Sequence, residues 1–463
     1  MGWITVLAVT GLLCAAVASA QDLPARPAFA PNAGNPILPG YYADPSVVQV
    51  DGRAYIYATL DPWGGRTLGC WESADWKNWT YRDLNWPTKE ACTSPTSRDA
   101  MVWAPSVVHG PDGKFHMAVS VGNEVWAGVA DAPLGPWRNA VGEKKPWIPY
   151  DAKPGFHMID AEYFVDTDGT PYLYWGSGFN WVNGKCWAVK LKADFVTFDG
   201  DVKDVTPANY FEAPFMLKHG GRYHLMYSSG KTTEETYQVH VAVGDSPFGP
   251  FKETAESPVL ATDKTNDVIS PGHHAVFEKN GKAYILYHRH SVPFDPAFVG
   301  RQTCVDELTF SADGRMGKVI PTHTGPALVQ NRQGTTKPLA VTYSASSSLN
   351  ANTGPERAGD SNYATRWAAG KDEKQSWLQI DLGSSRTVTR QEIRFEYAWK
   401  PYAVKLEISA SGRTWFGIGD AFPTPTKGSP VYLESPITTR YLRLVFPAGP
   451  NQPAPSVWEW LAY

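Results

Sequence analysis

One short pattern occurs five times and limits the folds that this chain of 463 residues can adopt. Each copy is a turn that ends in glycine, followed by an alternating strand that is rich in aromatic and apolar residues. The turn glycines are spaced 61, 56, 52 and 60 residues apart: Gly52, Gly113, Gly169, Gly221 and Gly281. Asp, Gly or Asn precedes each of them, which is a two-residue hairpin signal because primed turns need positive φ. Every repeat is therefore predicted to contain a β-hairpin.

A second motif lies out of phase with the hairpins and ends in an aromatic residue. Its four copies are residues 73–79, 131–137, 192–198 and 245–251, and they are typical of an outer turn in each unit. Units of this length, with several short strands and no amphipathic helix, favour four-stranded blades arranged around an axis. The sequence thus predicts an all-β protein that begins with a five-bladed β-propeller. A solenoid is the alternative, but long irregular loops between the strands suit a closed ring better.

Residues eight or nine positions before the turn glycines should occupy equivalent places near the propeller axis. They are Asp44, Ala104, Asp160, Glu212 and His273. A single acid at such a place would more simply cap a turn or pair with a neighbour, but three acids at one phase favour a shared site. Carboxylates in a confined pocket repel each other, so at least one should keep its proton at neutral pH. Paired carboxylates of this kind cleave glycosidic bonds, and hydrolysis of a sugar is the predicted chemistry.

Six motifs in chain order resemble glycoside hydrolase family 43 over about residues 38–328. They are Ala43-Asp44-Pro45-Ser46, Trp103-Ala104-Pro105-Ser106, Ile159-Asp160-Ala161-Glu162, Phe211-Glu212-Ala213-Pro214, Pro271-Gly272-His273 and Gly300-Arg301-Gln302-Thr303. The resemblance implies that Asp44 is the general base, that Glu212 is the general acid, and that Asp160 tunes and orients the acid. It also implies substrate-binding roles for Trp103, His273 and Arg301, with Trp103 lining the sugar pocket and Arg301 near the base.

The same resemblance implies inversion of the anomeric configuration by a water molecule held at the base. The Asp44 and Glu212 carboxyls are then expected roughly 6.5–9.5 Å apart, the spacing of inverting enzymes. Related invertase-like propellers use a retaining Asp, usually preceded by Asn. Ala43 precedes Asp44 here, which favours inversion.

No cofactor is expected to be required. His273 matches an axial histidine that supports a calcium ion in some family members and only water in others, and no cage of hard oxygen ligands is visible beside it. Calcium on the axis stays an alternative. Strand packing or exposure is the default for His274 and for residues 287–290. Four tryptophans are candidates for stacking on sugars, with packing between blades as the default: Trp63, Trp126, Trp175 and Trp181.

The pattern changes around residues 330–338, so we predict a propeller over 21–330, a linker over 331–339 and a second domain over 340–463. Alternating strands at 377–383, 404–409 and 441–446 predict a β-sandwich of the jelly-roll type. Residues 360–367, 381–383, 411–415 and 439–443 resemble the discoidin or coagulation-factor C-type domain, which is shared with galactose-binding carbohydrate modules. An aromatic cluster of Tyr397, Trp399 and Tyr402 is a candidate glycan-binding face. The alternative is a domain that packs over one side of the propeller.

Residues 1–20 have the pattern of a secretory signal peptide, with an apolar stretch followed by Ala18-Ser19-Ala20. A secreted or periplasmic location is therefore expected. Four cysteines follow the signal: Cys70, Cys92, Cys186 and Cys304. Proximity in the sequence makes Cys70–Cys92 the expected disulfide, with buried free thiols as the alternative.

Charge excludes one class of partner. The 42 basic residues nearly balance the 46 acidic ones, and no basic run could follow a phosphate backbone or an anionic membrane. The expected partner is a polysaccharide or an oligosaccharide, with glycan binding by the C-terminal domain as a further expectation.

Together, these features predict a secreted, inverting glycoside hydrolase. By the family resemblance it is exo-acting and removes furanose or pentose residues from polysaccharide side chains. An α-L-arabinofuranosidase is the first choice, and a β-D-xylosidase or a β-D-galactofuranosidase with the same catalytic residues is the alternative. A non-catalytic glycan-binding propeller and an interaction scaffold are the other classes, and both leave the three carboxylates unexplained.

Overall fold

The structure is a computed structural model that describes residues 26–332, 337–371, 373, 375–423, 426–448 and 453–463. The signal peptide expected at residues 1–20 lies outside this part of the chain. Among the described residues, no helix is both long and apolar enough to cross a membrane. The helical elements in the described part of the chain are four 3₁₀ turns: η1 (Pro27–Phe29), η2 (Tyr150–Ala152), η3 (Lys264–Asn266) and η4 (Pro355–Gly359).

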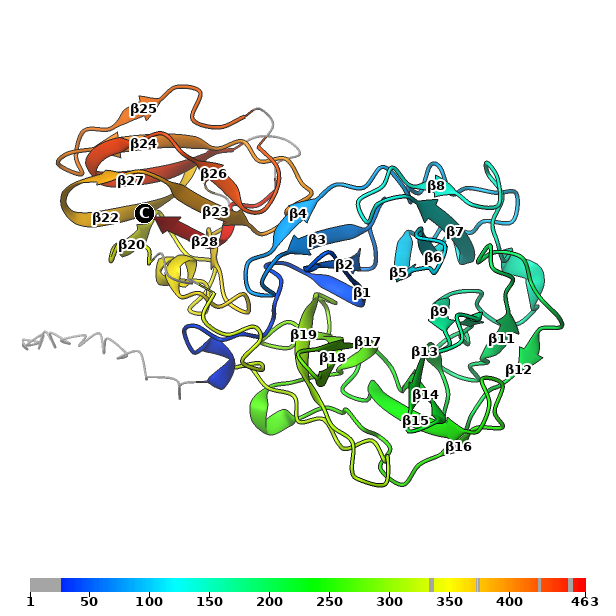
Figure 1. Ribbon diagram of the computed structural model, residues 1–463. Helices are drawn as coiled ribbons and strands as arrows, with labels where there is room; N and C mark the ends of the chain where they lie inside the picture. The colour runs from blue at the N-terminus through cyan, green and yellow to red at the C-terminus, as the bar shows by residue number, and fades with distance from the viewer. Residues whose placement is uncertain (1–25, 333–336, 372, 374, 424–425, 449–452) are drawn as a thin grey trace, which may run out of the picture.

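Five antiparallel sheets circle a common axis and form a five-bladed propeller (Figure 1). Blade 1 contains β1 (Tyr42–Val50), β2 (Arg53–Leu60), β3 (Gly69–Ser73) and β4 (Thr80–Arg82). Blade 2 contains β5 (Val102–His109), β6 (Phe115–Val121), β7 (Glu124–Ala130) and β8 (Arg138–Asn139). Blade 3 contains β9 (Glu162–Val165), β10 (Pro171–Trp175), β11 (Trp187–Lys190) and β12 (Lys203–Asp204). Blade 4 contains β13 (Glu212–His219), β14 (Arg222–Ser229), β15 (Gln238–Gly244) and β16 (Lys252–Glu253). Blade 5 has three strands: β17 (Gly272–Lys279), β18 (Lys282–His290) and β19 (Arg301–Leu308).

Both repeated motifs lie where the sequence places them. The glycine turns connect the first strand of each blade to the second, and all five glycines have positive φ, between 74° and 85°. The second motif forms the turn between the third and fourth strands of blades 1 to 4. The predicted propeller is therefore confirmed, together with the hairpin that starts each blade.

Apolar side chains from neighbouring blades fill the space between the sheets. The cluster between blades 1 and 2 includes Tyr57, Trp86, Met117 and Trp126. Cys70 and Cys92 are buried in this same cluster as free thiols, and Cys186 and Cys304 are also free and buried. The expected Cys70–Cys92 disulfide is therefore wrong, because these cysteines pack as small apolar side chains instead.

The C-terminal part is a sandwich of two antiparallel sheets, as predicted (Figure 1). The five-stranded sheet has the order β20 (Thr342–Ala345), β22 (Gln375–Val388), β27 (Ile437–Pro447), β24 (Lys405–Ser409) and β25 (Phe416–Ile418). The four-stranded sheet has the order β21 (Trp367–Ala368), β28 (Ser456–Ala462), β23 (Gln391–Phe395) and β26 (Val431–Leu433). Their inner faces enclose a core that includes Trp367, Leu444 and Trp460.

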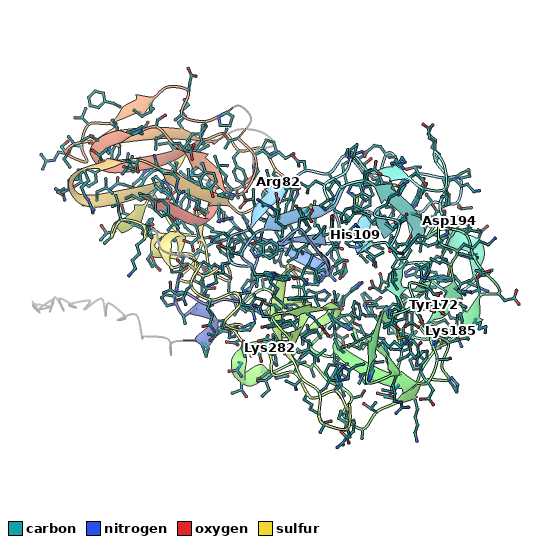
Figure 2. The ribbon with its side chains drawn as sticks, viewed as in Figure 1. Arg82, His109, Tyr172, Lys185, Asp194 and Lys282 are labelled. Atoms are coloured by element: carbon teal, nitrogen blue, oxygen red, sulfur yellow. The ribbon has the colours of Figure 1, made fainter. Side chains whose placement is uncertain are left out.

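The sandwich packs against the propeller beside blade 1, where Arg82 at the end of β4 is labelled in Figure 2. Tyr397 packs on Tyr41, with ring centroids 6.1 Å apart, and Trp399 packs on Tyr42 at 5.6 Å. Tyr402 is buried and stacks on Phe395 within the sandwich. Tyr402 is therefore buried away from any glycan, whereas Tyr397 and Trp399 are half-buried and pack on the propeller. Glycan binding at this cluster stays a prediction.

Candidate active site

A bulge near the start of the first strand places side chains at the propeller axis. The pairing register shifts between Ala43 and Ser46 in blade 1, and matching shifts occur in β5, β13 and β17. At this position near the start of the first strand, one residue of each blade has left-handed φ, between 37° and 57°: Asp44, Ala104, Asp160, Ala213 and His273. Left-handed φ is uncommon outside glycine and concentrates at functional sites.

Blade 4 differs from the expected pattern by one residue. Ala213 occupies the bulge, and Glu212 stands one position before it, paired with Ser228. The expectation that Glu212 shares the phase of Asp44 and Asp160 is therefore wrong. Despite this offset, the Glu212 side chain lines the same pocket as Asp44 and Asp160.

A ring of side chains from the second strands fixes these bulges. Each of them stands seven residues after a turn glycine and accepts a hydrogen bond from a backbone N–H of the next blade. The bonds are Ala104 N–H to Thr59 Oγ1 (2.9 Å), Asp160 N–H to Ser120 Oγ (2.9 Å), His273 N–H to Ser228 Oγ (3.0 Å) and Asp44 N–H to His288 Nδ1 (3.2 Å). Blade 3 has Gly176 at this place, which has no side chain to accept the corresponding bond.

Asp44 is held as an ionised carboxylate. Thr59 donates its hydroxyl to Oδ2 at 2.7 Å, and Arg301 Nη1 donates to Oδ1 at 3.0 Å. Burial would raise the pKa of Asp44, but Arg301, His273 and His288 outweigh it and hold the pKa well below its usual range. A carboxylate that stays ionised is available to accept a proton from water.

Glu212 has the opposite electrostatic state. Burial raises its pKa to about 7, although the Tyr237 hydroxyl (2.7 Å to Oε1) and the Ser177 hydroxyl (3.1 Å to Oε2) favour the charged form. The negative charge of Asp44 acts in the same direction as burial. Glu212 thus keeps its proton up to neutral pH, as a general acid must.

His273 lies close to both the Asp44 and the Asp160 carboxyls. His273 Nδ1 is 3.3 Å from Asp44 Oδ1 and 3.7 Å from Asp160 Oδ2. Burial, Glu212 and Asp44 raise the pKa of Asp160 well above its usual range, whereas burial lowers the pKa of His273. Asp160 therefore keeps its proton to higher pH than an ordinary aspartate.

The three carboxyls open into one pocket of about 400 Å³, lined by Trp63, Trp103, Phe179, Trp181, Asn180, His157, Ile159, Gly178, Phe211, Thr232, His273, Arg301 and the three acids. All six predicted site residues therefore line one cavity. Of the four candidate tryptophans, Trp63 and Trp181 line it, and Trp126 and Trp175 are buried between strands.

Sequence reasoning missed several residues of the site. Thr59, His288 and Tyr237 contact the carboxyls, and Asp61 holds Arg301. His288 was expected to serve strand packing or to lie exposed, yet its ring faces Asp44. The fixed offset of seven from the turn glycines could have found Thr59 and His288, whereas nothing in the repeat marks Tyr237.

Among the described residues, no group of three His, Cys, Asp or Glu side chains is arranged to hold a metal ion. Beside His273, the Arg301 guanidinium already contacts Asp44, so the immediate surroundings do not fit a resident cation.

Comparisons with known proteins agree with this geometry. The family model described as Glycosyl hydrolases family 43 matches residues 33–316, and the F5/8 type C domain matches residues 342–460. The chain therefore belongs to glycosyl hydrolases family 43. It is a glycoside hydrolase, as the sequence predicts, with a discoidin-like C-terminal domain.

Curated relatives and a solved structure support this membership. A β-D-galactofuranosidase of Aspergillus niger is 32% identical over 325 residues, which cover 65% of this chain and 88% of that protein. An arabinoxylan arabinofuranohydrolase of Bacillus subtilis is 26% identical over 352 residues, which cover 64% of this chain and 66% of that protein. A solved structure described as a glycoside hydrolase is 27% identical with a TM-score of 0.78, over 95% of this chain and 100% of that one.

Proposed function

We propose that this family 43 enzyme is an exo-acting, inverting furanosidase that removes one terminal sugar from a polysaccharide or oligosaccharide. The observation that carries the proposal is the pair of carboxyls in one pocket with opposite protonation, Asp44 ionised and Glu212 neutral. A binding module has no use for an acid held protonated opposite a base. The expected signal peptide supports a secreted or periplasmic enzyme.

The reaction is a single displacement. Glu212 gives its proton to the glycosidic oxygen as the bond to the anomeric carbon breaks, and the aglycone leaves as an alcohol. Water attacks the opposite side of the anomeric carbon, and its proton passes to Asp44. One water molecule is consumed, and the released sugar has the inverted configuration.

Two furanosides suit this pocket. β-D-galactofuranose and α-L-arabinofuranose have the same configuration around the ring, and the first carries one additional hydroxymethyl group on its side chain. A cavity of about 400 Å³ has room beyond a five-carbon sugar, and Asn180, Thr232 and His157 supply polar contacts at its wall. The galactofuranosidase relative favours galactofuranose, and the arabinofuranohydrolase relative supports arabinofuranose as the second candidate.

The test compares nitrophenyl β-D-galactofuranoside, α-L-arabinofuranoside and β-D-xyloside as substrates of the full chain. We expect kcat/KM on the galactofuranoside to exceed that on the arabinofuranoside by about 10- to 200-fold, the usual worth of one such group in a fitted pocket. Proton NMR of the first turnovers should show the inverted anomer. Asp44→Asn is the control and should abolish turnover.

Two outcomes would overturn parts of the proposal. Turnover that survives in Asp44→Asn excludes Asp44 as the base, and release of the retained anomer excludes the single displacement. A preference for the arabinofuranoside assigns the second candidate instead.

A further inference from the structure

The arginine that holds the catalytic base comes from the neighbouring blade. The boundary between blade 5 and blade 1, where the propeller ring closes, is called the seam. Arg301 begins β19 in blade 5, whereas Asp44 lies on β1 in blade 1. Asp61, which follows β2, binds the guanidinium at two points, with Nε–Oδ2 at 2.8 Å and Nη2–Oδ1 at 2.9 Å. The backbone N–H of Arg301 also donates to Asp61 Oδ2 at 2.9 Å. All of these groups are buried.

Tyr41 contacts the backbone next to the Asp61–Arg301 ion pair. Its carbonyl accepts the Asp61 N–H at 3.1 Å. Its ring lies so close to Gly300 that a Cβ atom there would stand 2.9 Å from Tyr41 Cδ1. Tyr41 thus contacts the backbone on both sides of the Asp61–Arg301 pair.

The sandwich in turn holds Tyr41. The Tyr41 hydroxyl donates to Glu396 Oε1 at 3.2 Å, and the same oxygen accepts from Arg366 Nη2 at 2.9 Å. Trp458 packs edge-on against the Tyr41 ring, with centroids 5.6 Å apart. Tyr41 is 1% exposed, so its position depends on the sandwich.

A second contact reaches the residue after Arg301. Gln302 is fully buried, and its Nε2 donates to the carbonyl oxygen of Tyr363 in the sandwich at 2.9 Å. The backbone of Arg301 is therefore flanked by Gly300, which packs on Tyr41, and by Gln302, which bonds to Tyr363. Both contacts lead to the C-terminal domain.

We propose that the C-terminal sandwich is a positioning element of the active site, which acts through Tyr41 and Gln302 to keep Arg301 against the catalytic base. The proposal rests on the proposed role of Asp44. Tyr41, Asp61 and Gln302 are positioning residues, because none of them lines the pocket.

The test uses Tyr41→Phe, which removes the hydroxyl and keeps the ring, and Gln302→Met, which removes the donor and keeps the length. Each should lower kcat/KM by about 3- to 10-fold, the worth of one buried hydrogen bond, and KM should change little. Other groups around Asp44 stay in place in both variants: His273 on β17, His288 on β18, Asp160 before β9, and Asp61. When Arg301 is held less firmly against Asp44, the pKa of Asp44 rises. The acidic limb of the pH profile of kcat/KM should therefore move to higher pH.

Arg394→Met is the matched control. Arg394 is 2% exposed and crosses the same interface, where it donates to the Trp79 carbonyl oxygen and the Ser429 hydroxyl. Its guanidinium also lies over the Tyr363 ring, 5.6 Å from the centroid, so it serves as the control for Tyr41→Phe. We expect a lower Tm in this variant with an unchanged acidic limb. The inference is overturned if the limb stays fixed in Tyr41→Phe and Gln302→Met, or if it moves equally in Arg394→Met. An inactive wild-type chain, or an active Asp44→Asn variant, would instead mean that the proposed function has failed.

Discussion

At the scale of single residues, the two catalytic carboxyls differ in the partners that bind their charged forms. Asp44 accepts hydrogen bonds from the Arg301 guanidinium and the Thr59 hydroxyl, whereas Glu212 accepts them from the neutral hydroxyls of Tyr237 and Ser177. Both are buried, so burial pushes both pKa values upward, and the cation beside Asp44 decides the difference. The acid and the base are thus assigned by environment rather than by residue type.

Tyr237→Phe tests the balance at Glu212. The Tyr237 hydroxyl stabilises the charged carboxylate, so its removal should raise the pKa of Glu212 from about 7. The acid then keeps its proton to higher pH, and the basic limb of kcat/KM should move upward by about one unit. Ser177→Ala should shift it in the same direction. A limb that moves downward would show that the hydroxyl accepts from a protonated Glu212.

Glu212→Gln tests the acid itself. Glutamine cannot donate a proton to the leaving oxygen, so cleavage of natural oligosaccharides should fall by about 10²- to 10⁴-fold. Activated nitrophenyl furanosides need little protonation and should lose much less activity. Equal losses of kcat on both substrates would exclude the acid role.

At the scale of strands, the blades support one another through hydroxyl groups at one fixed place. Thr59 has two tasks, because it accepts the Ala104 N–H from blade 2 and donates to Asp44 in its own blade. The same side chain thus links two blades and contacts the catalytic base.

Thr59→Val should separate these tasks from simple packing, since valine has nearly the same shape. We expect a loss of about 1–3 kcal/mol in the free energy of unfolding, because a buried N–H loses its acceptor. The pKa of Asp44 should also rise, which reduces kcat/KM at acidic pH. Ser46→Ala is the control: Ser46 accepts the Val107 N–H at the same blade boundary without touching a carboxyl, so it should lose stability and keep its pH profile. Matching pH profiles would exclude a role of Thr59 at Asp44.

Much of the fold could be predicted because the turn glycines repeat and glycine turns depend on local sequence. Asp44, Asp160, Glu212 and His273 could be predicted because they lie eight or nine residues before those turns. Trp103 and Arg301 do not follow from that spacing and are assigned from the resemblance to family 43. The one-residue offset between Glu212 and the bulge residue Ala213 could not be predicted. Spacings of eight and nine residues before the turn glycine are both compatible with the bulge, and the sequence does not show which residue occupies it. Asp61, Tyr237 and the free thiol state of Cys70 depend on packing between segments far apart in the chain, which a single sequence does not reveal.

At the scale of the whole molecule, the sandwich and the propeller share one interior. The core cluster of blades 1 and 5 also contains Ala398 and Trp399 of the sandwich. In the described part of the chain, the N-terminal segment does not add a strand to the sheet of blade 5. It contacts that blade through isolated hydrogen bonds, such as the one from the Ile37 N–H to the Thr303 carbonyl oxygen at 2.9 Å. The sandwich covers this seam.

Arg332 joins three parts of the protein at the seam. Its guanidinium donates to the carbonyl oxygens of Ala33 (3.0 Å), Gly34 and Pro36 (2.5 Å) in the N-terminal segment and of Ser361 (3.3 Å) in the sandwich. We expect one calorimetric unfolding transition for the full chain. Neither domain can unfold alone without exposing the Arg332 guanidinium and the carbonyl oxygens that it binds. Two resolved transitions in the wild type would contradict a shared interior.

Arg332→Met should destabilise both domains together. Several buried carbonyls lose their donor, which costs about 3–5 kcal/mol, and for a chain of this size that corresponds to a fall in Tm of about 3–5 °C. Lys427→Ala is the control, because Lys427 crosses the same interface in an exposed pair with Asp83 at 2.7 Å, and such pairs contribute about 0–1 kcal/mol. If Arg332→Met leaves the Tm unchanged, the seam is held by apolar packing alone, and the polar contacts of the sandwich only orient it.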